Sequence, residues 1–158
     1  MANTQAMTTS FMGELMTATH NFGVAPIRAA TTVDSFKAAL YVATATYNAS
    51  TTAYSVTNEV SGTGYSAGGV AVTFGTPPTA TNSSVTAGVA FVTPSASITY
   101  SGVTLATAFD AVLIYNSTQS NKAVSVHTFG SQTITAGTFT LTMPANTTST
   151  ALIRLATT

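Results

Sequence analysis

The sequence predicts an all-β protein, a single sandwich or jelly-roll-like domain of about eight strands. Three observations indicate this class. From Asp34 onward, apolar side chains recur at every second position, the period of a strand with one buried face. Runs of Gly, Pro and Asn, which favour turns, separate these short segments. No helical pattern alternates with them, so a parallel α/β sheet is not expected.

The expected strands follow one another at short intervals. They cover residues 36–43, 69–74, 85–93, 97–100, 108–116, 122–129, 138–143 and 151–156. The third carries a candidate bulge at Gly88. The segment 108–116 is almost continuously apolar, so we expect a central strand buried on both faces. The predicted core consists of apolar side chains from these strands: Phe36, Leu40, Val72, Phe91, Phe109, Ala111, Leu113, Phe139, Leu141 and Ile153.

Residues 1–33 follow a different pattern from residues 34–158, and we divide the chain there into an N-terminal arm with a helix and a β-sandwich domain. A polar arm precedes Ser10, which can cap one short helix. Phe11, Leu15 and Phe22 form an apolar stripe on that helix. The stripe needs a cover, which is either an open end of the sandwich or a partner.

Charge is scarce in this chain. Only 5% of the residues are charged and the formal net charge is zero, against about 25% charged residues in an average soluble domain. No basic cluster is available for phosphates, so we expect neither nucleic acid nor an anionic membrane as a partner. A neutral surface rich in hydroxyl groups suits a protein that works inside an assembly.

The cysteine count and the first residues bear on the compartment. The chain contains no cysteine, so it has neither disulfides nor thiolate chemistry. Its start lacks the basic and apolar regions of a signal peptide, and no segment is long enough to span a membrane as a helix. We therefore expect synthesis and folding in a cytoplasm.

Four glycines resemble a phosphate-binding loop at first sight. Gly62, Gly64, Gly68 and Gly69 come close to the pattern G-x-G-x-x-G. A dinucleotide site needs a helix after the glycines, whereas a strand is expected here, and no lysine follows as in a P-loop. We interpret the segment as a structural loop whose glycines supply positive φ angles, and which can still form a contact surface.

No catalytic, cofactor-binding or metal-binding residues are predicted. The two histidines, His20 and His127, lie in different elements and the acidic residues are isolated. If Asn116 faces Asn121 in a hairpin, Asp110 falls opposite His127. We interpret that pair as two polar residues on one sheet face rather than a catalytic dyad.

The remaining polar signals are interpreted structurally. Four Asn-x-Ser/Thr sequons, at Asn48, Asn82, Asn116 and Asn146, are read as turn residues. The six tyrosines are scattered along the chain and tryptophan is absent. A free carbohydrate-binding or hydrolytic sandwich should show clustered aromatic residues or paired acids, so this function ranks last.

Several segments resemble a family of small virion structural proteins of tailed bacteriophages. They are "SFMGELMTATHNFG", "FKAALYVATATYNASTTAYSVTNEVSGTGYSAGGVAVT", "FDAVLIYNSTQSNKAVSVHTFGSQTITAGTFTLTMP" and "ALIRLA", which together cover most of the chain. The resemblance implies a non-enzymatic virion component assembled in the host cytoplasm. No catalytic motif comes with it.

The expected function is a capsid decoration or cement protein that binds and stabilises the major capsid protein shell as a homo-oligomer, a dimer or trimer. The alternative is another virion position: a head–tail connector, a tail component or a receptor-contacting spike. The residues expected to contact the capsid or another partner are Phe11, Leu15, Phe22, Gly62, Gly64 and Tyr65.

Overall fold

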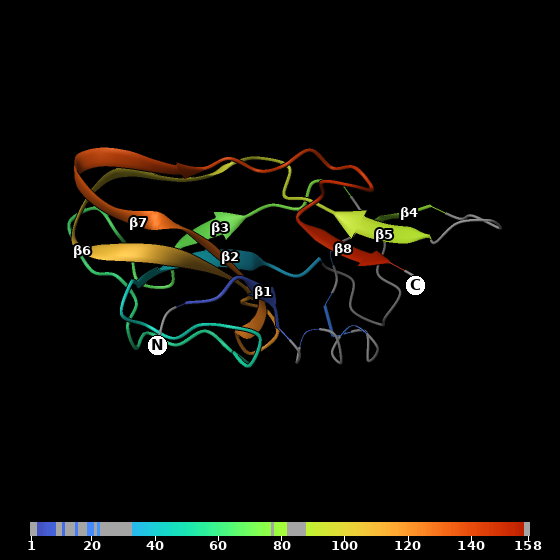
Figure 1. Ribbon diagram of the computed structural model, residues 1–158, viewed down its shortest axis with the longest axis horizontal. Coiled ribbons are helices and arrows are strands. Elements are labelled where there is room, and N and C mark those ends of the chain that lie inside the picture. Colours follow the sequence, from blue (N-terminus) through green and yellow to red (C-terminus); the bar gives the residue numbers. More distant parts are fainter. Residues whose placement is uncertain are drawn as a thin grey trace.

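The computed structural model describes residues 3–8, 11, 15, 19–20, 22, 33–76, 78–81 and 88–156. These residues form two antiparallel sheets (Figure 1), a five-stranded sheet in the order β1-β7-β6-β2-β3 and a three-stranded sheet in the order β4-β5-β8. The strands are β1 (Ala6–Met7), β2 (Phe36–Val42), β3 (Val70–Val72), β4 (Thr79–Ala80), β5 (Val89–Val92), β6 (Ile98–Asn116), β7 (Lys122–Leu141) and β8 (Ile153–Ala156). The predicted all-β class is confirmed.

The β6–β7 hairpin dominates the fold, with strands of 19 and 20 residues. The sequence predicts each as two separate strands, and this is wrong. Both strands bend back over themselves at the left of Figure 1, so that their outer halves lie over β2 and β3. A series of register shifts between Tyr100 and Ala111 accompanies the bend, as bulges bend and twist the strands that carry them. The described residues form eight strands, but these are not the eight predicted ones. Four predicted strands merge into β6 and β7, and β1 and β4 are not predicted from the sequence.

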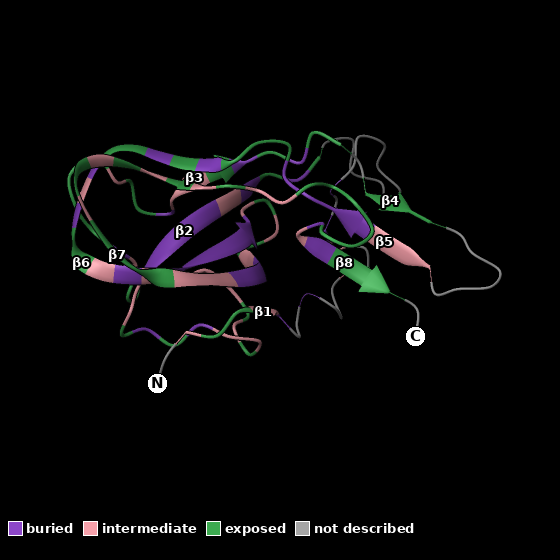
Figure 2. Ribbon diagram, turned by 45° about the horizontal axis from the view of Figure 1, so that its top comes forward, coloured by how far each residue is buried: buried purple, intermediate pink, exposed green. Residues whose placement is uncertain are grey.

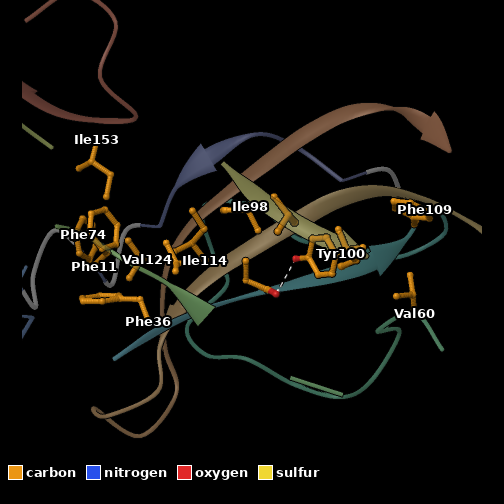
Figure 3. Close-up of a cluster of buried hydrophobic side chains, with 14 of the residues drawn as sticks. Phe11, Phe36, Val60, Phe74, Ile98, Tyr100, Phe109, Ile114, Val124 and Ile153 are labelled. Carbon is orange, nitrogen blue, oxygen red and sulfur yellow. Dashed lines mark hydrogen bonds between the residues drawn. The ribbon is translucent and has the colours of Figure 1, made fainter. Parts of the chain in front are cut away.

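The main core lies between the two layers that the bent hairpin forms with β2 and β3 (Figure 3). Tyr100, on the outer half of β6, crosses this core and donates a hydrogen bond of 2.8 Å to the carbonyl oxygen of Ala38. Two predicted core residues, Phe139 and Leu141, are only half-buried because they lie on the outer half of β7. The other eight are buried: Phe36, Leu40, Val72, Phe91, Phe109, Ala111, Leu113 and Ile153.

The opposite face of β2 and β6 is buried as well (Figure 2). A second cluster there contains Leu113 and Tyr115 from β6, and the connection after β2 covers it with Ala45, Tyr47 and Tyr54. The last six residues of β6, 111–116, are therefore all buried. This confirms the prediction of a central strand with two buried faces.

Residues before Asp34 pack on the same sheet and core as the rest. Ala6 and Met7 pair with Val126 and Ser125 of β7. Phe11 is completely buried, and Phe22 stacks on Phe36 with their ring centroids 4.6 Å apart. The aromatic stripe is therefore covered within the chain, the first of the two covers considered above. Phe11 and Leu15 are helical as predicted, whereas Thr19, His20 and Phe22 are not, so the helix does not extend to Phe22. The remaining residues of the predicted helix, and the beginning of the strand predicted from Val85, lie outside the described residues.

Two of the sequon asparagines are confirmed as turn residues. The side-chain oxygen of Asn48 accepts the backbone N–H of Ser50 at 2.8 Å. The side-chain oxygen of Asn116 accepts the N–H groups of Thr118 and Gln119, both at 3.1 Å. These bonds fix the backbone at the start of each turn, as short amide side chains commonly do. Asn82 lies outside the described residues.

Candidate functional site

The connection between β2 and β3, residues 43–69, carries three of the predicted contact residues. Gly62 and Gly64 are exposed and Tyr65 is half-buried. Here we call this segment the β2–β3 loop. It has little regular secondary structure, yet it is fixed at several points by hydrogen bonds to neighbouring strands. Those bonds decide whether the loop can act as a preformed contact surface.

Glu59 accepts three hydrogen bonds that tie the loop together. Its Oε2 accepts the hydroxyl of Tyr54 at 2.7 Å, and its Oε1 accepts the hydroxyl of Tyr65 at 2.7 Å and the N–H of Gly68 at 2.8 Å. Hydrogen bonds to a carboxylate are about twice as strong as neutral ones. The single charge of the loop thus joins three of its segments.

Tyr65 also connects the loop to the sheet. Its hydroxyl oxygen accepts the N–H of Leu40 at 3.0 Å while the hydroxyl donates to Glu59. Its ring stacks against Tyr100 with centroids 5.9 Å apart. Burial raises the pKa of the Tyr65 hydroxyl far above its usual value, and the bond to Glu59 raises it further. The hydroxyl therefore stays protonated and remains a donor at physiological pH.

All six tyrosines support this loop, although they are scattered in the sequence. Tyr41 and Tyr47 lie with ring centroids 3.7 Å apart, and Tyr54 stacks on Tyr115 at 4.7 Å. The hydroxyls of Tyr41 and Tyr115 donate to backbone carbonyls of the loop, at Ser55 and Gly68. The tyrosines, scattered along the sequence, thus come together in space. Because their rings face one another and their hydroxyls bond the chain itself, they act as internal supports.

The exposed glycines lie where the loop backbone meets the bend of β6. Thr63 forms a bridge with Thr104, and the N–H of Thr104 donates to the Thr63 carbonyl at 2.9 Å. A β-carbon on Gly62 would lie 2.0 Å from the carbonyl oxygen of Thr104, so the requirement at Gly62 is close approach. Positive φ angles occur at Gly64, Gly68 and Gly69, as predicted, but not at Gly62.

The predicted contact residues fall into two separate groups. Phe11, Leu15 and Phe22 border an apolar groove against β5 and β8, whereas Gly62 and Gly64 lie on the bend of β6. Figure 3 shows Phe11 at one end of the core, whereas Tyr100, on which the Tyr65 ring stacks, lies farther along it toward Phe109 and Val60. The structure thus does not bring all six residues onto one surface.

A buried polar cluster at the start of β2 was missed by the sequence reasoning. The side-chain amide of Asn116 donates to Asp34 Oδ2 at 2.9 Å and lies 3.1 Å from Nδ1 of His20. Gln119 donates to the other oxygen of Asp34 at 3.1 Å. The cluster joins the N-terminal segment to the β6–β7 turn. Its four residues come from three parts of the chain that are far apart in sequence, and no local spacing indicates such an arrangement.

The predicted Asp110–His127 pair does not form. The register places Val112 opposite His127 and Lys122 opposite Asn116, with a shift between Ile114 and Tyr115. The five-residue turn and this shift move His127 two positions along the strand. Asp110 instead accepts a hydrogen bond from the side-chain amide of Asn3, and Nε2 of His127 lies 2.8 Å from the Ser125 hydroxyl.

We predict that His127 makes stability depend on pH. Burial lowers its pKa to about 4, whereas in the unfolded chain it takes up a proton near its usual 6.5. The unfolded state therefore binds more protons between these values, so stability falls as the pH drops from about 6.5 to about 4. Urea unfolding of the wild type and of His127→Gln over this range measures the difference. A variant with the same pH slope as the wild type contradicts the prediction.

Within the ranges given above, no group of three or more His, Cys, Asp or Glu side chains is placed to hold a metal ion. In the same part of the chain, no helix has the length and apolar character needed to cross a bilayer.

The fold and site define an all-β protein of two antiparallel sheets with a fixed, weakly charged loop at the bend of its longest hairpin. In comparisons with known proteins, the chain matches no protein-family model, no curated protein and no solved structure.

We predict that Glu59→Gln loosens the β2–β3 loop. Glutamine keeps one acceptor oxygen but replaces the other with a donor, which would face a tyrosine hydroxyl or the Gly68 N–H. Toward Gly68 this donor is left unsatisfied, and toward a tyrosine hydroxyl a bond to a charged group is replaced by a neutral one, so we expect a loss of about 1–3 kcal/mol. Chemical denaturation measures this loss, and amide hydrogen exchange of Gly68 should speed up. Ser61→Ala, an exposed change in the same loop, is the control and should leave both unchanged.

Proposed function

We propose that this chain is a non-enzymatic structural protein of a tailed-bacteriophage virion, a decoration or cement protein that binds the major capsid protein shell. The observation that carries the proposal is the β2–β3 loop: an exposed, neutral backbone surface around Gly62 and Gly64, held in place by Glu59 and the tyrosines. A preformed loop binds without a large ordering cost. The segment resemblances to virion structural proteins support the same function.

Low charge determines how the attachment should behave. With 5% charged residues, contacts should consist mainly of apolar packing and neutral hydrogen bonds, which salt screens little. Attachment to the shell should therefore survive a rise from low to molar salt.

Removing residues 1–33 is a poor test of attachment, because Phe11 and Phe22 are buried in the core and their loss should destabilise the whole chain.

Counting copies tests the proposed position. Mass spectrometry and gel densitometry of particles from the phage that encodes the chain should give hundreds of copies per particle, as expected for a shell component with capsid symmetry. About a dozen or fewer copies would instead favour the connector, tail or spike position. Absence of the chain from purified particles would overturn the whole proposal.

Substitutions in the loop test the surface. We predict that lysine at the exposed positions Ser61 and Ser66 weakens binding to shells lacking the protein, because each buries a charge without a partner. Thr148→Lys is the matched control: it is also exposed and lies in the segment before β8, near the opposite end of the molecule (Figure 1). Co-sedimentation with the shells measures binding. If the loop lysine variants bind as well as Thr148→Lys, the attachment surface lies elsewhere on the chain.

A further inference from the structure

The outer edge of β7 is covered by the chain itself for only part of its length. The carbonyl of Val124 accepts the N–H of Thr8, and β1 pairs with Ser125 and Val126. Beside these, the N–H of Ala123 donates to Thr52 of the β2–β3 loop. The beginning of β7 therefore already accepts extended segments as additional strands.

Beyond Val126, the described residues provide no further strand on this side. In the order β1-β7-β6-β2-β3, β1 is the only neighbour of β7 besides β6, and its register ends at Val126. The outer half of β7 forms the upper border of the molecule in Figure 1. A strand edge of this kind exposes unpaired N–H and C=O groups and acts as a template for another strand.

The regular part of this outer half has none of the usual protections against pairing with a strand of another molecule. Residues 138–142 contain no charged residue and no proline, which comes only at Pro144. Thr138 and Thr140 face solvent, while Phe139 and Leu141 are half-buried against the core. Apolar surface on Phe139 and Leu141 thus remains available for burial at the edge.

We infer that the outer half of β7 pairs antiparallel with the same strand of a second copy, joining the two five-stranded sheets across a two-fold axis. In such a pair, residues that face one another are both even-numbered or both odd-numbered. Thr138 and Thr140 then meet threonines, and Phe139 and Leu141 extend the apolar face. A two-fold contact requires this kind of self-complementary surface, and a neutral edge meets its copy without repulsion.

This inference specifies the homo-oligomer expected from the sequence and rests on the proposed function only for its place on a capsid, so it is tested on the purified chain alone. Sedimentation or light scattering from about 1 μM to about 1 mM, the range of weak association, should show a dimer. Thr138→Lys with Thr140→Lys should raise the dissociation constant at least tenfold, because like charges then face each other directly. The control is Thr99→Lys with Ser101→Lys, two exposed positions on β6, Thr99 being opposite Thr140. It puts the same charges one strand inward and should change the constant less than twofold.

Crosslinking provides a second measurement that does not depend on the lysine variants folding. The chain has no cysteine, so Thr140→Cys forms a disulfide only between copies. Facing residues of antiparallel strands lie at a Cα separation that a disulfide spans. Under oxidation, Thr138→Cys, Thr140→Cys or, where the two-fold axis lies at Phe139, an equimolar mixture of the two variants should crosslink, and Thr99→Cys should not.

Three results overturn the inference. The first is a monomer at all concentrations, the second a dimer that the edge lysines leave intact, and the third equal crosslinking through Thr99→Cys. If the chain stays monomeric but the edge lysines abolish shell binding, the edge binds the capsid protein instead. If the chain forms the dimer but does not bind shells, the proposed function is contradicted and the inferred strand pairing still holds.

Discussion

Gly69→Ala is expected to destabilise the protein more than any other single change considered for this chain. Gly69 has a φ of +69°, and a β-carbon there would lie 1.7 Å from the carbonyl oxygen of Ala38. The left-handed backbone alone costs an L-residue roughly 1–2 kcal/mol. The overlap adds strain against β2, whose backbone is held between β6 and β3. We expect a loss above about 4 kcal/mol, a size that few mechanisms reach.

Two other glycines separate the backbone contribution to this loss of stability from the contribution of the steric overlap. Gly102 also has a positive φ, of +64°, but a β-carbon there meets nothing within 4 Å, so Gly102→Ala should cost only the backbone part, about 1–2 kcal/mol. Gly130 has open space and no positive φ, so Gly130→Ala should be neutral or slightly stabilising. Urea unfolding should rank the three variants in this order. A Gly69→Ala protein as stable as Gly102→Ala would show that β2 and the loop move apart easily.

Leu113→Ala is expected to cost about 2–5 kcal/mol, the usual range for a buried leucine whose site cannot collapse. Leu113 is completely buried near the end of β6, between Ala39 of β2 and Val126 of β7. Its neighbours belong to fixed strands and to the tyrosine-supported loop, so the cavity should persist. Val56→Ala is the control, because Val56 is 66% exposed and should change stability by less than about 0.5 kcal/mol. A cost near zero at Leu113 would contradict the central position of β6.

Local periodicity explains which parts of the fold could be predicted. Segments such as 36–42 alternate apolar and polar side chains or are continuously apolar, and they form strands as expected. The residues that join the two halves of β6 include Gly102 and several polar side chains, which have the composition of a turn. Only the pairing with β7 makes them a bent strand, and that pairing depends on residues distant in sequence.

The candidate site was less accessible to sequence reasoning. The glycines from Gly62 to Gly69 mark the loop, and their backbone roles were largely predicted. The function of Glu59 depends on Tyr54, Tyr65 and Gly68 converging in space. Nothing in the spacing of single tyrosines indicates that they share one cluster.

The hydrogen bonding of the β2–β3 loop has a consequence for resistance to proteases. Long connections without regular structure are normally where proteolytic nicking concentrates, and this one carries Tyr47, Tyr54 and Tyr65, all chymotrypsin-type cleavage sites. Cleavage requires the chain to leave its folded path and enter an active site in extended form. With the hydroxyls of Tyr54 and Tyr65 bonded to Glu59, local opening should be rare. The loop should therefore be cut only about as fast as the whole protein unfolds.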